Sequence, residues 1–178
     1  MTDQDHTTKP AASTEIDLRQ NVLAGLRAKR ERADRVIQGT EFLERPLGIA
    51  GPEVVVRYKY VPLADAQKQG KMIEGAPESQ QGYLASCDTL VLACHEIMLQ
   101  VGGELVPLAL PGEEPVTFNT YRVLGEHLEF DTSRTGYTSR TAILDCFKSE
   151  YAVVQEAQFV SQWMATLGGK GQESFLSN

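Results

Sequence analysis

Cys94, His95 and Glu96 are adjacent in LVLACHEIMLQV, residues 90–101, and all three residue types occur in active sites. A histidine followed by a glutamate is the first half of the H-E-x-x-H zinc-protease pattern, in which two histidines four residues apart bind one ion. The residue four after His95 is Leu99, which has no atom that binds zinc. No C-x-x-C spacing supplies other ligands. The sequence therefore predicts no metal and no cofactor.

Cys94 next to His95 also raises the alternative of a thiol nucleophile with a histidine base. Such a pair must be in hydrogen-bond contact. In a helix, neighbouring side chains point about 100° apart, so these two do not face a common point. A cysteine-dependent enzyme built on Cys94 or Cys146 stays as an alternative, and rapid alkylation at neutral pH would identify it.

The apolar residues around these groups predict one long buried helix from near Pro77 to about Val101. They recur at helical spacing, and free cysteine behaves as a small buried hydrophobe. On this interpretation Cys87 and Cys94 are core residues. The stripe consists of Leu84, Cys87, Val91, Cys94, Met98 and Val101.

Composition limits the function. The chain has 178 residues, 42% of them hydrophobic, which suffices for a globular domain with a core. A net charge of −7 argues against a general nucleic-acid binder. Three cysteines at irregular spacing favour a reducing compartment, and no stretch has the length of a membrane span. We expect a soluble intracellular protein.

The chain divides into a predicted single domain, 14–167, between a disordered tail, 1–13, and a flexible tail, 168–178. The domain opens with a helix, 14–38, for which Thr14 and Asp17 are compatible with a capping box.

A basic block, Arg27–Arg35, lies in this first helix. Its five basic and two acidic residues give it +3, which leaves −10 for the rest of the chain. One interpretation is a solvated helix face with internal ion pairs. The other is a basic arm that docks on an acidic partner. The candidate partner-binding residues are Arg27, Lys29, Arg30, Arg32 and Arg35.

The other segments predict an α+β fold, mainly α, in which helices accompany a small sheet or hairpin. Residues 54–61 alternate as a strand that Pro62 ends, and ELVPLAL with EPVTF predicts a hairpin. LADAQKQGKM suggests a short helix or an ordered loop. Three helices should follow the hairpin: a short one capped by Asn119, the stretch TAILDCF, and a last amphipathic helix. The apolar face of the last helix is expected to carry Phe159, Trp163 and Leu167.

The order of these segments resembles the tail assembly chaperones of long-tailed phages that infect actinobacteria. Their pattern is a D-x-L-[IV]-x-A-C helix, a charged hairpin, a short helix ending in L-G, an R-x-x-[IV]-x-x-x-F helix, and a final helix with a tryptophan. The resemblance covers residues 54–167. The matching positions are Asp88, Leu90, Val91, Ala93, Cys94, Pro107, Leu108, Pro115, Val116, Phe118, Leu124, Gly125, Arg140, Ile143, Phe147 and Trp163.

The resemblance implies a non-enzymatic role in virion assembly. Members of this family bind the tape-measure protein, keep it soluble and help tail-tube subunits polymerise around it. They act in the host cytoplasm and are absent from the mature virion. For this chain, the acidic charge and the lack of a long apolar run predict no nucleic-acid partner and no membrane partner. A different intracellular interaction adaptor is the alternative. A very long helical reading frame next to the gene would favour the chaperone.

The resemblance also implies a programmed −1 frameshift near the end of the gene. Gly168, Gly169 and Lys170 are compatible with the slippery codons GGG-GGA-AAA or GGG-GGA-AAG. A longer form of the protein would then be a further partner, and residues 171–178 would belong only to the short form. A glycine helix stop followed by a flexible tail is equally compatible with these residues.

Overall fold

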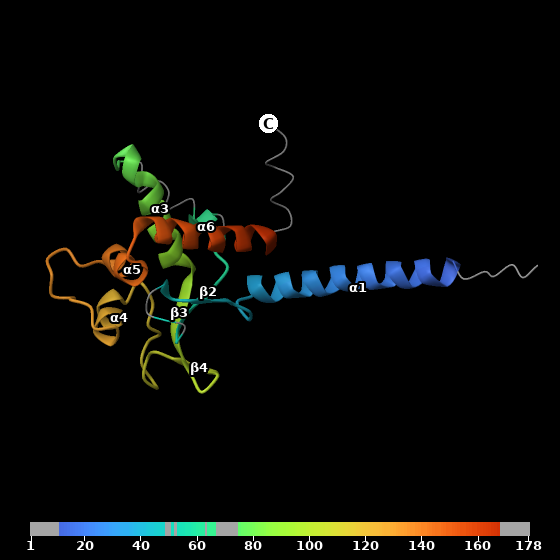
Figure 1. Ribbon diagram of the computed structural model, residues 1–178, viewed down its shortest axis with the longest axis horizontal. Coiled ribbons are helices and arrows are strands. Elements are labelled where there is room, and N and C mark those ends of the chain that lie inside the picture. Colours follow the sequence, from blue (N-terminus) through green and yellow to red (C-terminus); the bar gives the residue numbers. More distant parts are fainter. Residues whose placement is uncertain (1–10, 49–50, 52, 63, 67–74, 168–178) are drawn as a thin grey trace, which may run out of the picture.

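The computed structural model describes residues 11–48, 51, 53–62, 64–66 and 75–167, with side chains from residue 17 onward. A long helix comes first, and strands and shorter helices follow (Figure 1). The elements are α1 (Ala11–Ile37), β1 (Leu43–Pro46), β2 (Val54–Tyr58), α3 (Glu78–Ala93), β3 (Cys94–Val101), β4 (Glu104–Pro107), α4 (Tyr121–His127), α5 (Ser139–Phe147) and α6 (Glu150–Leu167).

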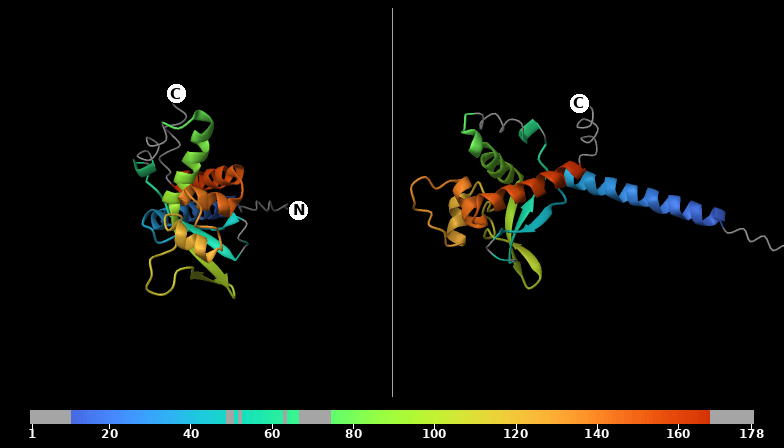
Figure 2. Two further views of the ribbon diagram at one scale, coloured as in Figure 1. Left: turned by 90° about the vertical axis from the view of Figure 1, so that its left-hand side faces the viewer. Right: turned by 45° about the horizontal axis from the view of Figure 1, so that its top comes forward.

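The four strands form one antiparallel sheet in the order β1-β2-β3-β4. Helices α3, α5 and α6 pack against one another beside it (Figures 1 and 2). The predicted class, α+β and mainly α, is confirmed. Of the expected tails, residues 1–10 and 168–178 lie outside the described residues, whereas residues 11–13 belong to α1 and are not part of a tail. Positions 63 and 67–72 of LADAQKQGKM also lie outside the described residues. Its residues 64–66 form a helical turn.

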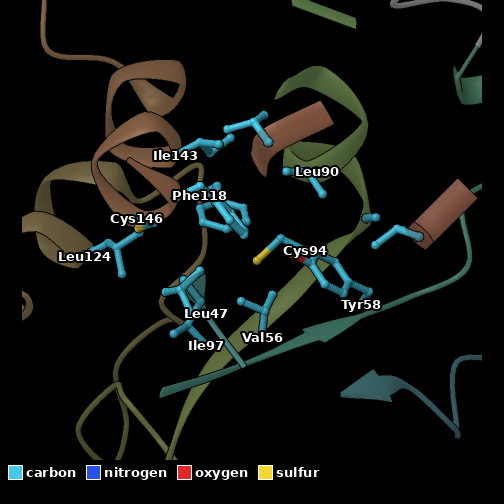
Figure 3. Close-up of a cluster of buried hydrophobic side chains, with 14 of the residues drawn as sticks. Leu47, Val56, Tyr58, Leu90, Cys94, Ile97, Phe118, Leu124, Ile143 and Cys146 are labelled. Atoms are coloured by element: carbon cyan, nitrogen blue, oxygen red, sulfur yellow. The ribbon is translucent and has the colours of Figure 1, made fainter. Parts of the chain in front are cut away.

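The core lies between the inner face of the sheet and the helices (Figure 3). On β2, Val54, Val56 and Tyr58 share the face that packs in the core, as the alternation in the sequence predicts, and Val55 on the other face is also buried. Phe118, from the segment before α4, is fully buried in the same cluster. One cluster of buried side chains therefore joins β1 to α6.

The predicted helix through residue 101 is wrong, because α3 ends at Ala93 and residues 94–101 form β3. This segment is an inner strand: β2 pairs along one edge and β4 along the other. Pairing on both sides satisfies its backbone groups, and a short apolar run fits a buried strand as well as a helix. The burial predicted for Cys87 and Cys94 is confirmed, while Val101 is exposed.

The predicted hairpin is shifted along the chain. The observed hairpin joins β3 to β4 through Gly102 and Gly103, which both have positive φ. EPVTF adds no strand, although the Val116 carbonyl accepts a hydrogen bond from the Ile97 amide at 2.8 Å. Asn119 is not the cap of α4, since Thr120 occupies that position.

Both remaining helix predictions need adjustment. The first helix begins at Ala11, so Thr14 lies inside it and is no cap. On α6 the buried face is rotated from the predicted one, and Phe159 is 43% exposed. That helix instead buries Val153, Glu156, Ala157 and Val160.

Candidate protein-interaction helix

The first helix, α1, projects from the domain and touches it at one end only (Figures 1 and 2). Its C-terminal end lies beside α6, and the remainder runs away from every other described element. Every side chain from residue 17 to residue 32 is exposed. A helix held at one end has a long surface that no described part of the chain covers.

This uncovered surface is apolar along one face. Leu18, Val22 and Leu26 are 62%, 60% and 57% exposed. At about 100° per residue, Leu18 and Leu26 lie about 40° to either side of Val22. Leu23, 53% exposed, flanks them. We call Leu18, Val22 and Leu26 the arm stripe. Single exposed leucines are ordinary, but aligned ones mark an interaction surface.

The arm stripe continues into the contact with the domain. Val36 and Ala33 lie within about 40° of the direction of Val22 on the helix. Val36 is buried and Ala33 is half-buried. The same face of α1 is therefore covered where the helix joins the domain, which we call the root of the arm, and is exposed farther out. The arm stripe continues this contact surface along the part of α1 that no described residue covers.

The root of the arm ends in a well-defined helix stop. The amides of Gly39 and Thr40 donate to the carbonyls of Val36 and Arg35 at 3.0 and 2.9 Å. This is the Schellman pattern, and Gly39 adopts the positive φ of 72° that it requires. The Glu41 carboxylate accepts hydrogen bonds from Arg32 and Arg35. These contacts set the direction in which α1 leaves the domain.

The basic block is thus split in two. Arg32 and Arg35 bind Glu41, which lies beyond the helix. Within the described residues, Arg27, Lys29 and Arg30 form no ion pair. The internal ion pairs of the first interpretation are not formed, and two of the five candidate docking residues are already bound. By helical geometry Lys29 lies on the arm stripe, Arg30 flanks it, and Arg27 lies about 140° away.

The ion pairs of Glu41 predict that protonation of its carboxylate affects the end of α1 that joins the domain. Although desolvation raises the pKa of Glu41, the hydrogen bonds from Arg32 and Arg35 lower it below the ordinary 4.5. The contact therefore stabilises the root above pH 4.5 and is lost as the pH falls through the lowered pKa. We expect the amide NMR signals of residues 35–41 to titrate with a midpoint below 4.5, and not in Glu41→Gln. A midpoint at or above 4.5 would contradict this assignment.

Cys94 and His95 do not form a nucleophile and base pair. On β3 their side chains lie on opposite faces of the sheet. Cys94 is buried in the core, whereas the His95 ring stacks on Phe42 with 4.4 Å between centroids. Among the described residues, no three histidine, cysteine or acidic side chains are grouped as a metal site would need.

The thiols should be slow to react. Burial raises the pKa of Cys94 and of Cys146 to about 12, and it also raises the pKa of Cys87. Because the thiolate is the nucleophile, alkylation of the folded protein at pH 8 should be about a thousandfold slower than that of the unfolded protein. Mass spectrometry after iodoacetamide treatment measures this. Rapid labelling of folded Cys94 or Cys146 would instead support the cysteine-dependent enzyme.

Three carboxylates of the domain are bound by arginines. Asp88 on α3 binds Arg140 on α5 at 3.1 Å, and Glu96 binds Arg57 at 3.0 Å. Asp145 binds Arg134. The sequence analysis missed the Arg45 and Glu156 pair, which no local spacing signals because 111 residues separate them. These ion pairs hold elements of the fold together.

Comparison with protein-family models, with curated proteins and with solved structures finds no match in any of the three. None of the described helices has the length and apolarity that crossing a bilayer requires. The exposed arm stripe makes α1 the best candidate site. The sequence predicted a helix there, and the structure shows that its apolar face is exposed.

Proposed function

We propose that the protein is a non-enzymatic phage tail assembly chaperone, which binds and solubilises a tape-measure protein in the host cytoplasm and promotes tail-tube assembly. The observation that carries the proposal is the exposed arm stripe on a helix that projects from the rest of the domain. A tape-measure protein is a long, largely helical chain with apolar seams that self-associate unless covered.

The arm can supply the binding energy that this role needs. Burial of one Leu or Val side chain contributes about 1.5–3 kcal/mol before the costs of association. Three such side chains give reversible binding, which suits a chaperone that must leave before assembly is complete. Because all three are already exposed on one face of the helix, binding requires little rearrangement of the protein and a small free-energy cost for it.

The family pattern also has a physical basis in this fold. Asp88 and Arg140, both in the pattern, form the ion pair between α3 and α5. Gly125 lies where a Cβ atom would come within 2.4 Å of Thr132 and 2.9 Å of the Tyr137 hydroxyl. The pattern therefore falls on residues that this fold needs, which supports the resemblance. None of the matching positions lies on α1, so the pattern does not constrain the residues that we propose bind the partner.

Co-expression tests the proposal. A helical fragment from the long reading frame next to the gene should be insoluble alone and soluble with the protein. The two should then co-elute in size-exclusion chromatography. An adaptor for another helical protein would leave this fragment insoluble.

The gene sequence offers an independent prediction. If the chaperone gene is read in two frames, Gly168, Gly169 and Lys170 are encoded by a slippery run and the −1 frame stays open beyond it. Deleting residues 171–178 should then leave the thermal unfolding midpoint within about 1 °C of the full chain, because the described core ends at α6. Codons without slippage, or a closed −1 frame, would refute the frameshift.

A further inference from the structure

We propose that the partner of α1 is an acidic amphipathic helix, with apolar residues against the arm stripe and carboxylates against Lys29 and Arg30. This inference rests on the proposed function and adds the chemistry of the segment recognised. It differs from the sequence hypothesis, which assigned docking to all five basic residues.

The pattern on α1 changes along its axis. Leu18, Val22 and Leu26 lie toward the N-terminal end, and two of the three unpaired cations, Lys29 and Arg30, follow toward the domain. Leu18 and Arg30 are twelve residues apart, which is about 18 Å of helix, or between three and four turns. A partner helix of this length would contact the arm stripe over about two turns and then Lys29 and Arg30 over the following turn.

The cations are placed to meet a partner that lies on the arm stripe. Lys29 points within about 20° of Val22, and Arg30 lies about 80° away on the side that also carries Leu23. Glu41 holds Arg32 and Arg35 on other sides of the helix. Of the three described cations of α1 that form no ion pair, Lys29 and Arg30 lie nearest the apolar face, and each would be neutralised by a carboxylate across the interface.

A helix fits this face better than an anionic membrane does. Membrane-surface helices carry cations along both edges of the apolar face and aromatic anchors within it. On α1 the cation at one edge of the apolar face, Arg32, is bound by Glu41, and no described residue of the helix is aromatic. The rest of the chain has a net charge of −10 and would be repelled by an anionic bilayer.

Peptide binding to the full-length protein tests the inference. The probe is a fluorescein-labelled 18-residue amphipathic helix with a leucine stripe followed by three glutamates, compared with the same peptide carrying three lysines. Wild-type protein should bind the glutamate peptide about tenfold more tightly at low salt, and the preference should shrink with added salt. Lys29→Glu with Arg30→Glu should reverse the preference.

A matched control removes two exposed cations from the domain, Lys59→Glu with Arg122→Glu, and should leave the preference unchanged. Circular dichroism establishes that each variant is folded. Equal preference in the wild type and the Lys29→Glu/Arg30→Glu protein would overturn the inference. So would a wild-type dimer that buries the arm, or binding to phosphatidylglycerol vesicles that competes with the peptide.

The same variants separate this inference from the proposed function. A tape-measure fragment that stays soluble with Lys29→Glu/Arg30→Glu, but not when the arm stripe is made polar, would keep the chaperone function and overturn the acidic partner. A fragment that stays soluble with both variants would overturn α1 as the binding surface. A fragment that stays insoluble even with the wild-type protein would overturn the proposed function itself.

Discussion

Replacing Leu18, Val22 and Leu26 together with glutamine is expected to abolish solubilisation of the tape-measure fragment, with at least a hundredfold loss of affinity. Each replacement removes about 1.5–3 kcal/mol of burial from the complex, and 1.4 kcal/mol corresponds to a factor of ten. The fold should be unaffected, because all three side chains are exposed in the free protein. The soluble fraction after co-expression, and binding of the purified fragment, measure the effect.

The matched control replaces three apolar side chains of similar exposure elsewhere, Val101, Leu110 and Tyr151, with glutamine. This variant should solubilise the fragment as well as the wild type does. Equal loss in both variants would mean that general surface hydrophobicity, and not the arm stripe, holds the fragment.

Arg45→Ala is expected to cause the largest loss of stability among single substitutions of charged residues, about 2–4 kcal/mol. Arg45 on β1 donates two hydrogen bonds, at 2.8 and 3.2 Å, to Glu156 on α6, whose side chain is only 8% exposed. Removing the cation leaves a carboxylate buried beside the core. The arginine, 34% exposed, keeps some water, so the expected loss is below that of a fully buried pair.

Urea unfolding at neutral pH measures this loss. Arg45→Met with Glu156→Leu should recover most of it, because an apolar pair of similar volume removes the stranded charge. Arg32→Ala, at the exposed pair with Glu41, should cost less than 1 kcal/mol. A loss below 1 kcal/mol for Arg45→Ala would show that the pair does not tie the sheet to α6.

The class of the fold and the presence of its helices could be predicted because their apolar residues follow a 3.6-residue period, whereas several helix ends could not. Cys94 to Val101 could not be assigned, because helix and buried strand share the same short apolar pattern. What decides it is pairing with β2, which lies about forty residues earlier in the chain. Local sequence does not contain that information.

The candidate site was predictable only in part. The charges of the basic block indicated α1 as the candidate site. The sequence did not show that Glu41 binds Arg32 and Arg35, because the carboxylate reaches the two arginines only when the chain turns at the end of α1. The arm stripe is a set of apolar residues at helical spacing within the predicted helix. Such a pattern ordinarily faces the core of its own domain. Its exposure follows from the direction of the chain after Gly39, which depends on packing at Val36.

Hydrogen exchange of the purified complex with the tape-measure fragment tests the central claim most directly. If α1 is the binding surface, amides of residues 18–30 should exchange at least tenfold more slowly in the complex than in the free protein, while those of α3 and β3 should not change. A complex in which these amides exchange at their free rate, with new protection confined to the domain, would contradict the account.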